Sequence, residues 1–198
     1  MADKMQSTEL ELFSQAPLLI TESREEFDSL AEAFMQEIEP SGPIEQMYAA
    51  EIAILTWEIA RLRRCKIAIV NGDFRDALGS VVRELAGQPH SGTPEREWVD
   101  NLCFDWFSKP KAKKEVLNLL DQFRLDESAI EAKAIERNLS KLEVLDRMLT
   151  SLEARRNKAL HMIAEYRVAF ADQLKDVSNR VIESEVSVLV DRSTRASA

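Results

Sequence analysis

Two histidines and two cysteines are the side chains of this 198-residue chain best suited to acid–base, metal-ligand or nucleophilic chemistry. Glu165 follows His161 by one helical turn, so His161 could act as a lone acid–base group or ligand. The residue three positions before His161 is Lys158, so the Glu-x-x-His spacing of di-metal helical bundles is absent. The sequence therefore favours a solvated or helix-paired histidine at position 161, while His90 falls in a loop rich in glycine and proline.

Cys65 and Cys103 form no C-x-x-C pair, which predicts neither a disulfide framework nor a zinc site. Both lie in apolar helical patterns, where cysteine usually acts as a small buried hydrophobe. The sequence contains no glycine-rich phosphate loop and no G-x-S-x-G nucleophile motif. We therefore expect no catalytic residue, no metal site and no cofactor, and a protein that is not an enzyme. Metal chemistry on the carboxylate-rich helices is the least favoured alternative.

The cations that could bind nucleic acid are concentrated in one short segment, which contains Lys109, Lys111, Lys113 and Lys114. They crowd the start of an expected helix, where the helix dipole disfavours positive charge. Such a local conflict is typical of phosphate binding or of an acidic partner, but a solvated helix start is the favoured interpretation. Residues 1–50 carry the whole net charge of −9, so only a local basic patch of this kind could bind nucleic acid.

The elements that position these side chains are all expected to be α-helices. Residues 1–20 read as an acidic disordered arm, and residues 21–124 as a helical bundle region with starts at the Ser23 capping box, Pro43, Asp73 and Thr93. Asn71-Gly72 is expected to end the second helix near Val70. Residues 126–184 contain neither glycine nor proline, which predicts one long helix, and residues 185–198 read as a flexible tail, either a frayed helix end or a short strand.

The long helix carries an apolar strip with several eleven-residue steps, such as Leu149 to Leu160 and Ile163 to Leu174. This hendecad period predicts a coiled-coil-like helix that is nearly straight or slightly right-handed. A strip of this length must be covered, either by the front of its own chain or by another copy. The predicted partner interface comprises Leu142, Leu145, Leu149, Leu152, Arg155, Arg156, Leu160, Ile163, Phe170 and Leu174.

The segment from Glu51 to Lys66 places one tryptophan, Trp57, before four cations. Because Arg61, Arg63, Arg64 and Lys66 point in different directions around a helix, they form no single stripe for nucleic acid. A structural role is favoured, in which the arginine stems pack and their charged ends pair with acidic residues of the first helix.

Two segments resemble uncharacterised bacterial proteins that have a tryptophan- and arginine-rich helix early and an E-x-R-R-x-x-A-L helix late. The matching positions are Trp57, Arg61, Arg63 and Arg64, followed by Glu153, Arg155, Arg156, Ala159 and Leu160. The resemblance covers about a third of the chain and implies an all-helical fold of the kind found in genomes rich in mobile elements. It implies no activity.

These features predict a non-enzymatic helical interaction or scaffold protein that self-associates through the long helix. We expect a homo-oligomer or a helical protein partner. The alternative is a nucleic-acid-associated accessory or regulatory factor of a bacterial mobile element, acting through the lysines at 109–114. The first 30 residues lack a signal peptide and no segment approaches a membrane span, so a cytoplasmic location without a membrane partner is expected.

Overall fold

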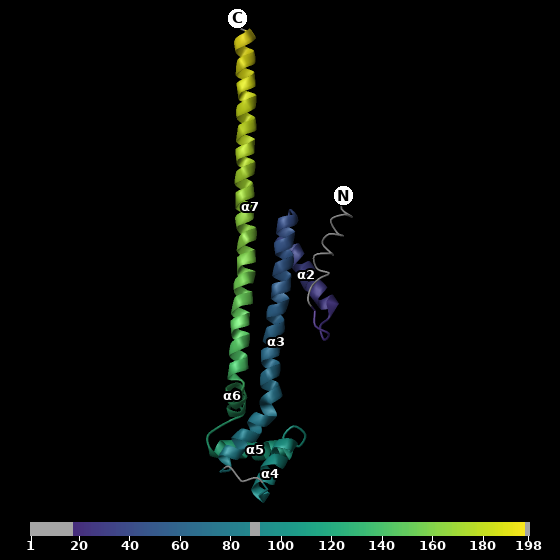
Figure 1. The fold of residues 1–198 in the computed structure, drawn as a ribbon, viewed down its shortest axis with the longest axis vertical. Coiled ribbons are helices and arrows are strands. Elements are labelled where there is room, and N and C mark those ends of the chain that lie inside the picture. The colour runs from purple at the N-terminus through teal and green to yellow at the C-terminus, as the bar shows by residue number, and fades with distance from the viewer. Residues whose placement is uncertain (1–17, 88–91, 197–198) are drawn as a thin grey trace. The chain divides into compact units, whose positions relative to one another are not determined.

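The structure is a computed structural model that describes residues 18–87 and 92–196, with side chains described as far as residue 180 in the last helix. These residues form six α-helices and no strand, which confirms the predicted all-α fold (Figure 1). The helices are α2 (Arg24–Ile38), α3 (Pro43–Leu85), α4 (Pro94–Asp105), α5 (Pro110–Gln122), α6 (Ser128–Arg137) and α7 (Leu139–Ala196). Most of the predicted acidic arm lies outside the described residues.

The chain divides into two compact units. Unit 1 contains Met1–Trp57 and Glu153–Ala198, and unit 2 contains Glu58–Leu152. The long helices α3 and α7 contribute residues to both units.

In unit 1, α2 begins at the capping box that the sequence predicts. The hydroxyl of Ser23 accepts a hydrogen bond from the Glu26 N–H at 3.2 Å and so caps the helix. Glu39 ends it in the left-handed conformation, with φ of 48°, and its N–H donates to the Met35 carbonyl. The cap and the left-handed residue fix both ends of α2 locally.

Helix α3 is packed on two faces in unit 1. Phe27 of α2 meets Trp57 of α3 edge to face, with ring centroids 5.7 Å apart. A second cluster joins Ile52 of α3 to Ala159 and Ile163 of α7. The helix is therefore covered by α2 on one side and by α7 on another.

The predicted break at Asn71-Gly72 is wrong, because α3 is one helix from Pro43 to Leu85. A glycine inside a helix costs only about 1 kcal/mol relative to alanine. In unit 2, Phe74 packs against the core that Leu78 and Val82 help to form, and this packing continues the helical period past Gly72. Asp73, predicted to cap a new helix, lies within α3 instead.

The core of unit 2 gathers side chains from α3, α4, α5 and α6, and α4 and α5 lie beside the last turns of α3 (Figure 1). Its buried members include Leu78, Val99, Trp106, Leu120 and Ile130. Trp98 adds a polar link on the surface, since its indole N–H donates to Glu115 of α5 at 3.2 Å. The core thus joins three short helices to the end of a long one.

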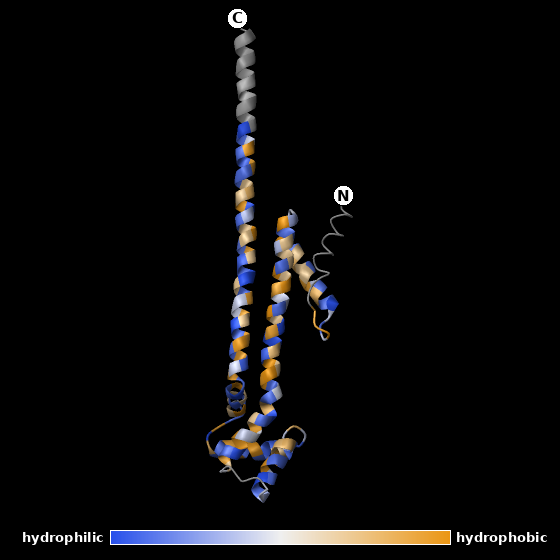
Figure 2. Ribbon diagram, in the orientation of Figure 1, coloured by the Kyte–Doolittle hydropathy of each residue, from blue (hydrophilic) through white to orange (hydrophobic). Residues whose placement is uncertain are grey.

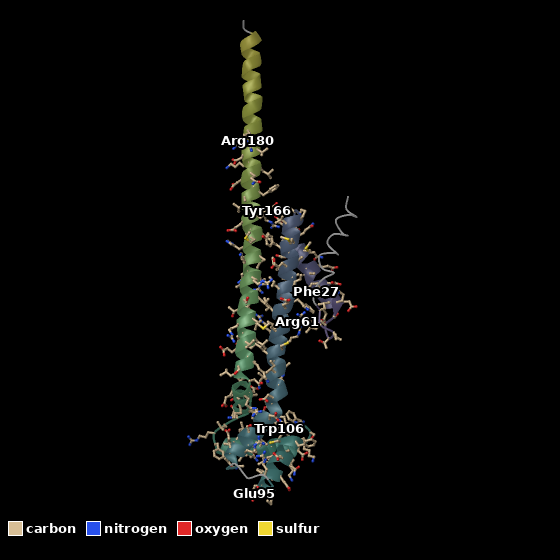
Figure 3. The ribbon with its side chains drawn as sticks, in the orientation of Figure 1. Phe27, Arg61, Glu95, Trp106, Tyr166 and Arg180 are labelled. Atoms are coloured by element: carbon tan, nitrogen blue, oxygen red, sulfur yellow. The ribbon has the colours of Figure 1, made fainter. Side chains whose placement is uncertain are left out.

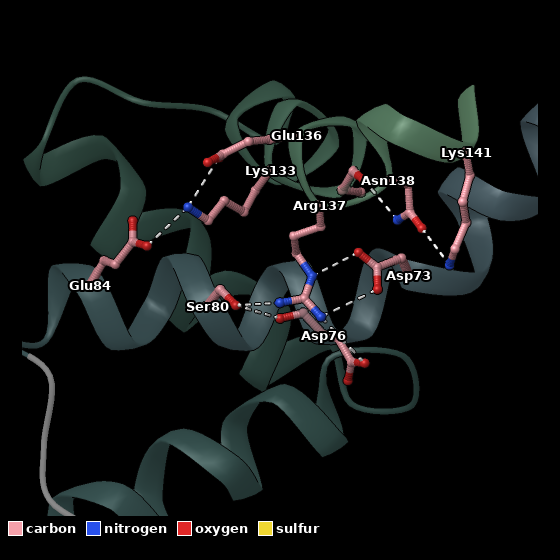
Figure 4. Close-up of polar contacts among 10 residues, drawn as sticks. Asp73, Asp76, Ser80, Glu84, Lys133, Glu136, Arg137, Asn138 and Lys141 are labelled. Carbon is pink, nitrogen blue, oxygen red and sulfur yellow. Dashed lines mark hydrogen bonds and ion pairs between the residues drawn. The ribbon is translucent and has the colours of Figure 1, made fainter. Parts of the chain in front are cut away.

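The prediction of one helix over 126–184 is also wrong at its start, because the chain breaks at Asn138 between α6 and α7. The buried side-chain amide of Asn138 donates to the Ala134 carbonyl at 3.0 Å, and its oxygen accepts from Lys141 (Figure 4). This side chain replaces helical backbone contacts at the break. At the other end, α7 continues through residues 185–196, where the sequence predicted a tail.

Ion pairs hold α6 against α3 in unit 2. The Arg137 guanidinium donates to Asp73 at 2.8 Å, and Lys133 lies between Glu84 and Glu136 at 3.1 Å from each (Figure 4). This ion pair raises the pKa of the Arg137 guanidinium, mainly through the hydrogen bond to Asp73. It fixes α6 at the turn where α7 begins.

Candidate interaction site

The predicted partner interface on α7 is divided by the structure into a covered part and an open part. Leu142 and Leu149 are buried, and Leu145 and Leu152 are half-buried, within unit 2. Ile163 is buried in unit 1 against Ile52. These positions pack against the rest of the same chain, so the chain itself covers this part of the apolar strip.

The basic positions in the middle of the predicted interface are engaged locally. Arg155 forms an exposed ion pair with Glu51 of α3, with 3.5 Å between nitrogen and oxygen. Arg156 is half-buried and donates to the neighbouring Asn157 side chain. Leu160 is exposed beside them. This segment therefore contacts α3 within unit 1.

The open part of the predicted interface is a strip of three apolar residues on α7. Phe170, Leu174 and Val177 are each about half exposed, and every residue from 167 to 180 is exposed. At 100° per residue the three lie within about 60° of one another around the helix. We call these three residues the α7 strip; it lies between the labelled Tyr166 and Arg180 in Figure 3, and the Tyr166 ring stacks on Phe170.

The two flanks of the α7 strip differ. On one side lie Gln173 and Arg180 and, further round, Asp176; on the other lie the small residues Ala171 and Ser178 and, further round, Lys175. The flank charges form no ion pair among the described residues, and Arg180 contacts only the Asp176 backbone carbonyl at 3.3 Å. Figure 2 shows apolar and polar residues alternating along this part of α7, as in a helix whose apolar residues lie on one face only.

Unit 2 contains an apolar groove of about 900 Å³ between α3 on one side and α6 and α7 on the other. Its apolar lining is Ile67, Val70, Phe74, Ile135, Leu139 and Leu142, and its polar rim is Lys66, Asn71, Glu131, Glu143, Asp146, Arg147 and Thr150. We call this the unit 2 groove. Its volume is typical of binding sites rather than of surface irregularities.

Large apolar side chains remain exposed in the unit 2 groove. Ile67 is 62% and Leu139 61% exposed, and Ile135 is 44% exposed. Ile67 was not predicted from the sequence. The predicted end of α3 near Val70 separated Ile67 and Val70 from Phe74, although the three residues form one stripe on a continuous helix. That i, i+3, i+7 spacing is the signal that could have found it.

The lysine cluster predicted for nucleic acid is partly used within unit 2. Lys109 pairs with Asp105 at 2.8 Å, and Lys113 pairs with Glu127 at 2.9 Å and lies over the Trp106 ring. Lys111 and Lys114 are exposed and have no ion-pair partner among the described residues. Two of the four predicted cations are thus available to a ligand.

Of the residues considered for chemistry, Cys103 belongs to unit 2 and His161 to unit 1, and His90 lies outside the described residues. Cys103 is buried, and burial raises the pKa of its thiol to about 11, so the thiolate is scarce at neutral pH. His161 lies exposed with its Nε2 3.2 Å from Glu165. Within the described ranges, no three His, Cys, Asp or Glu side chains are grouped so as to hold a metal ion. In the same part of the chain, no helix is both long and apolar enough to span a membrane.

One ion pair in unit 1 was not foreseen from the sequence. Glu45 of α3 is buried, and its carboxylate accepts two hydrogen bonds from Arg167 of α7, at 3.2 Å from Nε and 2.9 Å from Nη2. Arg167 also donates to the Ile38 carbonyl at the end of α2. The bonds from Arg167 lower the pKa of Glu45, burial opposes them, and the Ser41 N–H adds to the lowering.

No protein-family model, curated protein or solved structure matches this chain. The features that bear on its function are therefore the α7 strip, the unit 2 groove and the exposed Lys111 and Lys114.

Proposed function

We propose that this protein is a non-enzymatic helical interaction protein that self-associates through the α7 strip. The observation that carries the proposal is the exposure of Phe170, Leu174 and Val177 on a stretch of helix that has no buried residue from 167 to 180. Isolated helices of this length are marginal in water, and most helical stability comes from packing an apolar face. A partner that covers the strip would supply that packing.

The part of the predicted interface that remains open is short and includes its C-terminal end. Leu142, Leu149 and Ile163 are already covered by the chain itself, so the contact with a partner falls to Phe170 and Leu174. The free cysteines agree with the predicted reducing, cytoplasmic location, which stays part of the proposal.

We expect Leu174→Glu to convert an oligomer into a monomer, because association would bury the new carboxylate without a partner. Light scattering coupled to gel filtration should give more than the 22.5 kDa of one chain for the unaltered protein and one chain for the variant. We expect the dissociation constant to rise at least tenfold.

The matched control is Val168→Glu, which adds the same charge to an exposed valine on about the opposite face of α7. It should leave the mass unchanged. A monomeric unaltered protein, or equal dissociation by both variants, would contradict the proposal.

A second candidate function, nucleic-acid binding, is favoured by the two exposed lysines without ion-pair partners, Lys111 and Lys114. Two phosphate contacts predict an affinity for duplex DNA that falls with about the square of the salt concentration. A double Lys→Glu variant at these positions should abolish retention on DNA at low salt, while Lys109→Glu, which alters a paired lysine, should reduce it less. Absence of retention by the unaltered protein at low salt would remove this candidate.

A further inference from the structure

We infer that the unit 2 groove of one copy receives the α7 strip of a second copy. The inference rests on the proposed self-association and adds the site at which the strip binds. Three residues of the groove lining, Ile67, Ile135 and Leu139, and all three residues of the strip remain exposed in one chain. Each therefore has apolar area to bury on association.

The spacing of the α7 strip suits a groove between helices. Phe170, Leu174 and Val177 stand at i, i+4 and i+7, the anchor spacing with which an amphipathic helix binds an apolar groove. The unit 2 groove is open along two helical walls, and Ile67 and Leu139 project apolar surface from opposite walls. The small flank residues Ala171 and Ser178 would let the α7 backbone approach one wall closely.

The strip that fills the groove must come from another chain. Leu139, Leu142 and Asp146 of α7 form part of the groove wall, and the same helix continues without a break through the strip. An unbroken helix cannot fold back onto its own earlier turns. A second copy supplies an identical strip without any change in the helix.

The charges around the two surfaces are complementary. The α6 and α7 wall of the groove carries Glu131, Glu143 and Arg147, which form no ion pair among the described residues. The flank of the strip that includes Gln173 carries Arg180 and Asp176. Arg180 can therefore face the two glutamates, and Asp176 can face Arg147. The other wall carries Asn71 and the already paired Lys66, and faces the flank on which the small residues Ala171 and Ser178 lie next to the strip.

The first test is a mixing experiment with the full chain. Ile67→Glu alters the groove at an exposed position, and Leu174→Glu alters the strip. Each variant alone should be monomeric by light scattering. An equimolar mixture should form a heterodimer, because the first variant keeps its strip and the second keeps its groove. Phe104→Glu, at an exposed site of unit 2 outside the groove, should behave as the unaltered protein.

The second test reverses charge on both surfaces. Arg180→Glu, and separately the double variant Glu131→Lys with Glu143→Lys, should each weaken self-association several-fold at low salt. When the two are mixed, both contacts of the heterodimer regain opposite charges, so affinity should return to nearly that of the unaltered protein.

The outcomes separate this inference from the function on which it rests. If Leu174→Glu is monomeric but Ile67→Glu associates as the unaltered protein does, the strip binds elsewhere, for example to a second strip. The inference then fails, and the proposed function stands. If the unaltered protein is itself monomeric, both fail. Two monomeric variants that form no heterodimer on mixing would also overturn the inference.

Discussion

Phe27→Ala should destabilise the packing of α2 in unit 1 by about 3 kcal/mol, the largest effect we expect from a single substitution. The Phe27 ring is fully buried, packs with Ala31 and Ala53, and meets Trp57 edge to face at 5.7 Å. Removing the ring loses both its transfer free energy and the aromatic contact, and leaves a cavity in a cluster with few other members.

The loss should be local to α2. Hydrogen exchange followed by mass spectrometry should show faster exchange across Arg24–Ile38 and unchanged exchange in α4 and α5, whose core contains no unit 1 residue. Phe27→Leu keeps most of the apolar volume and should cost about 1 kcal/mol. Phe104→Ala, at a ring 66% exposed, should leave exchange in α2 as it is. Unchanged exchange in α2 of Phe27→Ala would show that this cluster does not hold the helix.

Helix ends fixed by local chemistry were predicted well from the sequence. Ser23 and Thr93 cap α2 and α4 as expected, and Pro94 and Pro110 stand at helix starts. These signals act through hydrogen bonds within three residues or through the fixed φ of proline, so no knowledge of distant packing is needed.

The two wrong boundaries depend on packing between distant segments. Gly72 stays helical because Phe74 and Leu78 pack against a core that includes residues from α4 to α6. No glycine or proline lies near the break at Asn138, so the sequence gives no signal of it. It is held by a buried amide that bonds the Ala134 carbonyl and by the ion pair of Arg137 with Asp73, 64 residues away.

The candidate site was predicted in part. The period of α7 placed Phe170 and Leu174 in a partner interface, and both are exposed. The period could not distinguish Phe170 and Leu174 from the buried Leu142 and Ile163. The packing of α2 and α3 decides which stretch of α7 is covered by the chain itself, and the period does not contain that information. The unit 2 groove was not predicted, since it requires α3 and α6 to be brought together.

Arg167→Ala should lower the free energy of unfolding by about 2 kcal/mol at neutral pH, because it removes the two hydrogen bonds that Arg167 donates to the buried Glu45 carboxylate. Breaking a fully buried pair costs about 3–5 kcal/mol. The Arg167 side chain is 46% exposed, so solvent screens the interaction and reduces that cost. Urea denaturation gives the difference directly. Arg155→Ala, which breaks the exposed pair with Glu51, should cost at most about 0.5 kcal/mol.

The effect of Arg167→Ala should depend on pH. The pKa of Glu45 is lowered in the folded protein, so the unfolded state binds more protons as pH falls, and the stability due to this carboxylate is present above its ordinary pKa. That stability is lost as pH falls through the lowered value. The gap between the unaltered protein and Arg167→Ala should therefore narrow below about pH 4.3. In Glu45→Gln no buried charge remains, so adding Arg167→Ala to it should cost less at neutral pH than in the unaltered chain. A cost that is equal in both backgrounds at neutral pH would show that Arg167 acts through the Ile38 and Glu39 carbonyls alone.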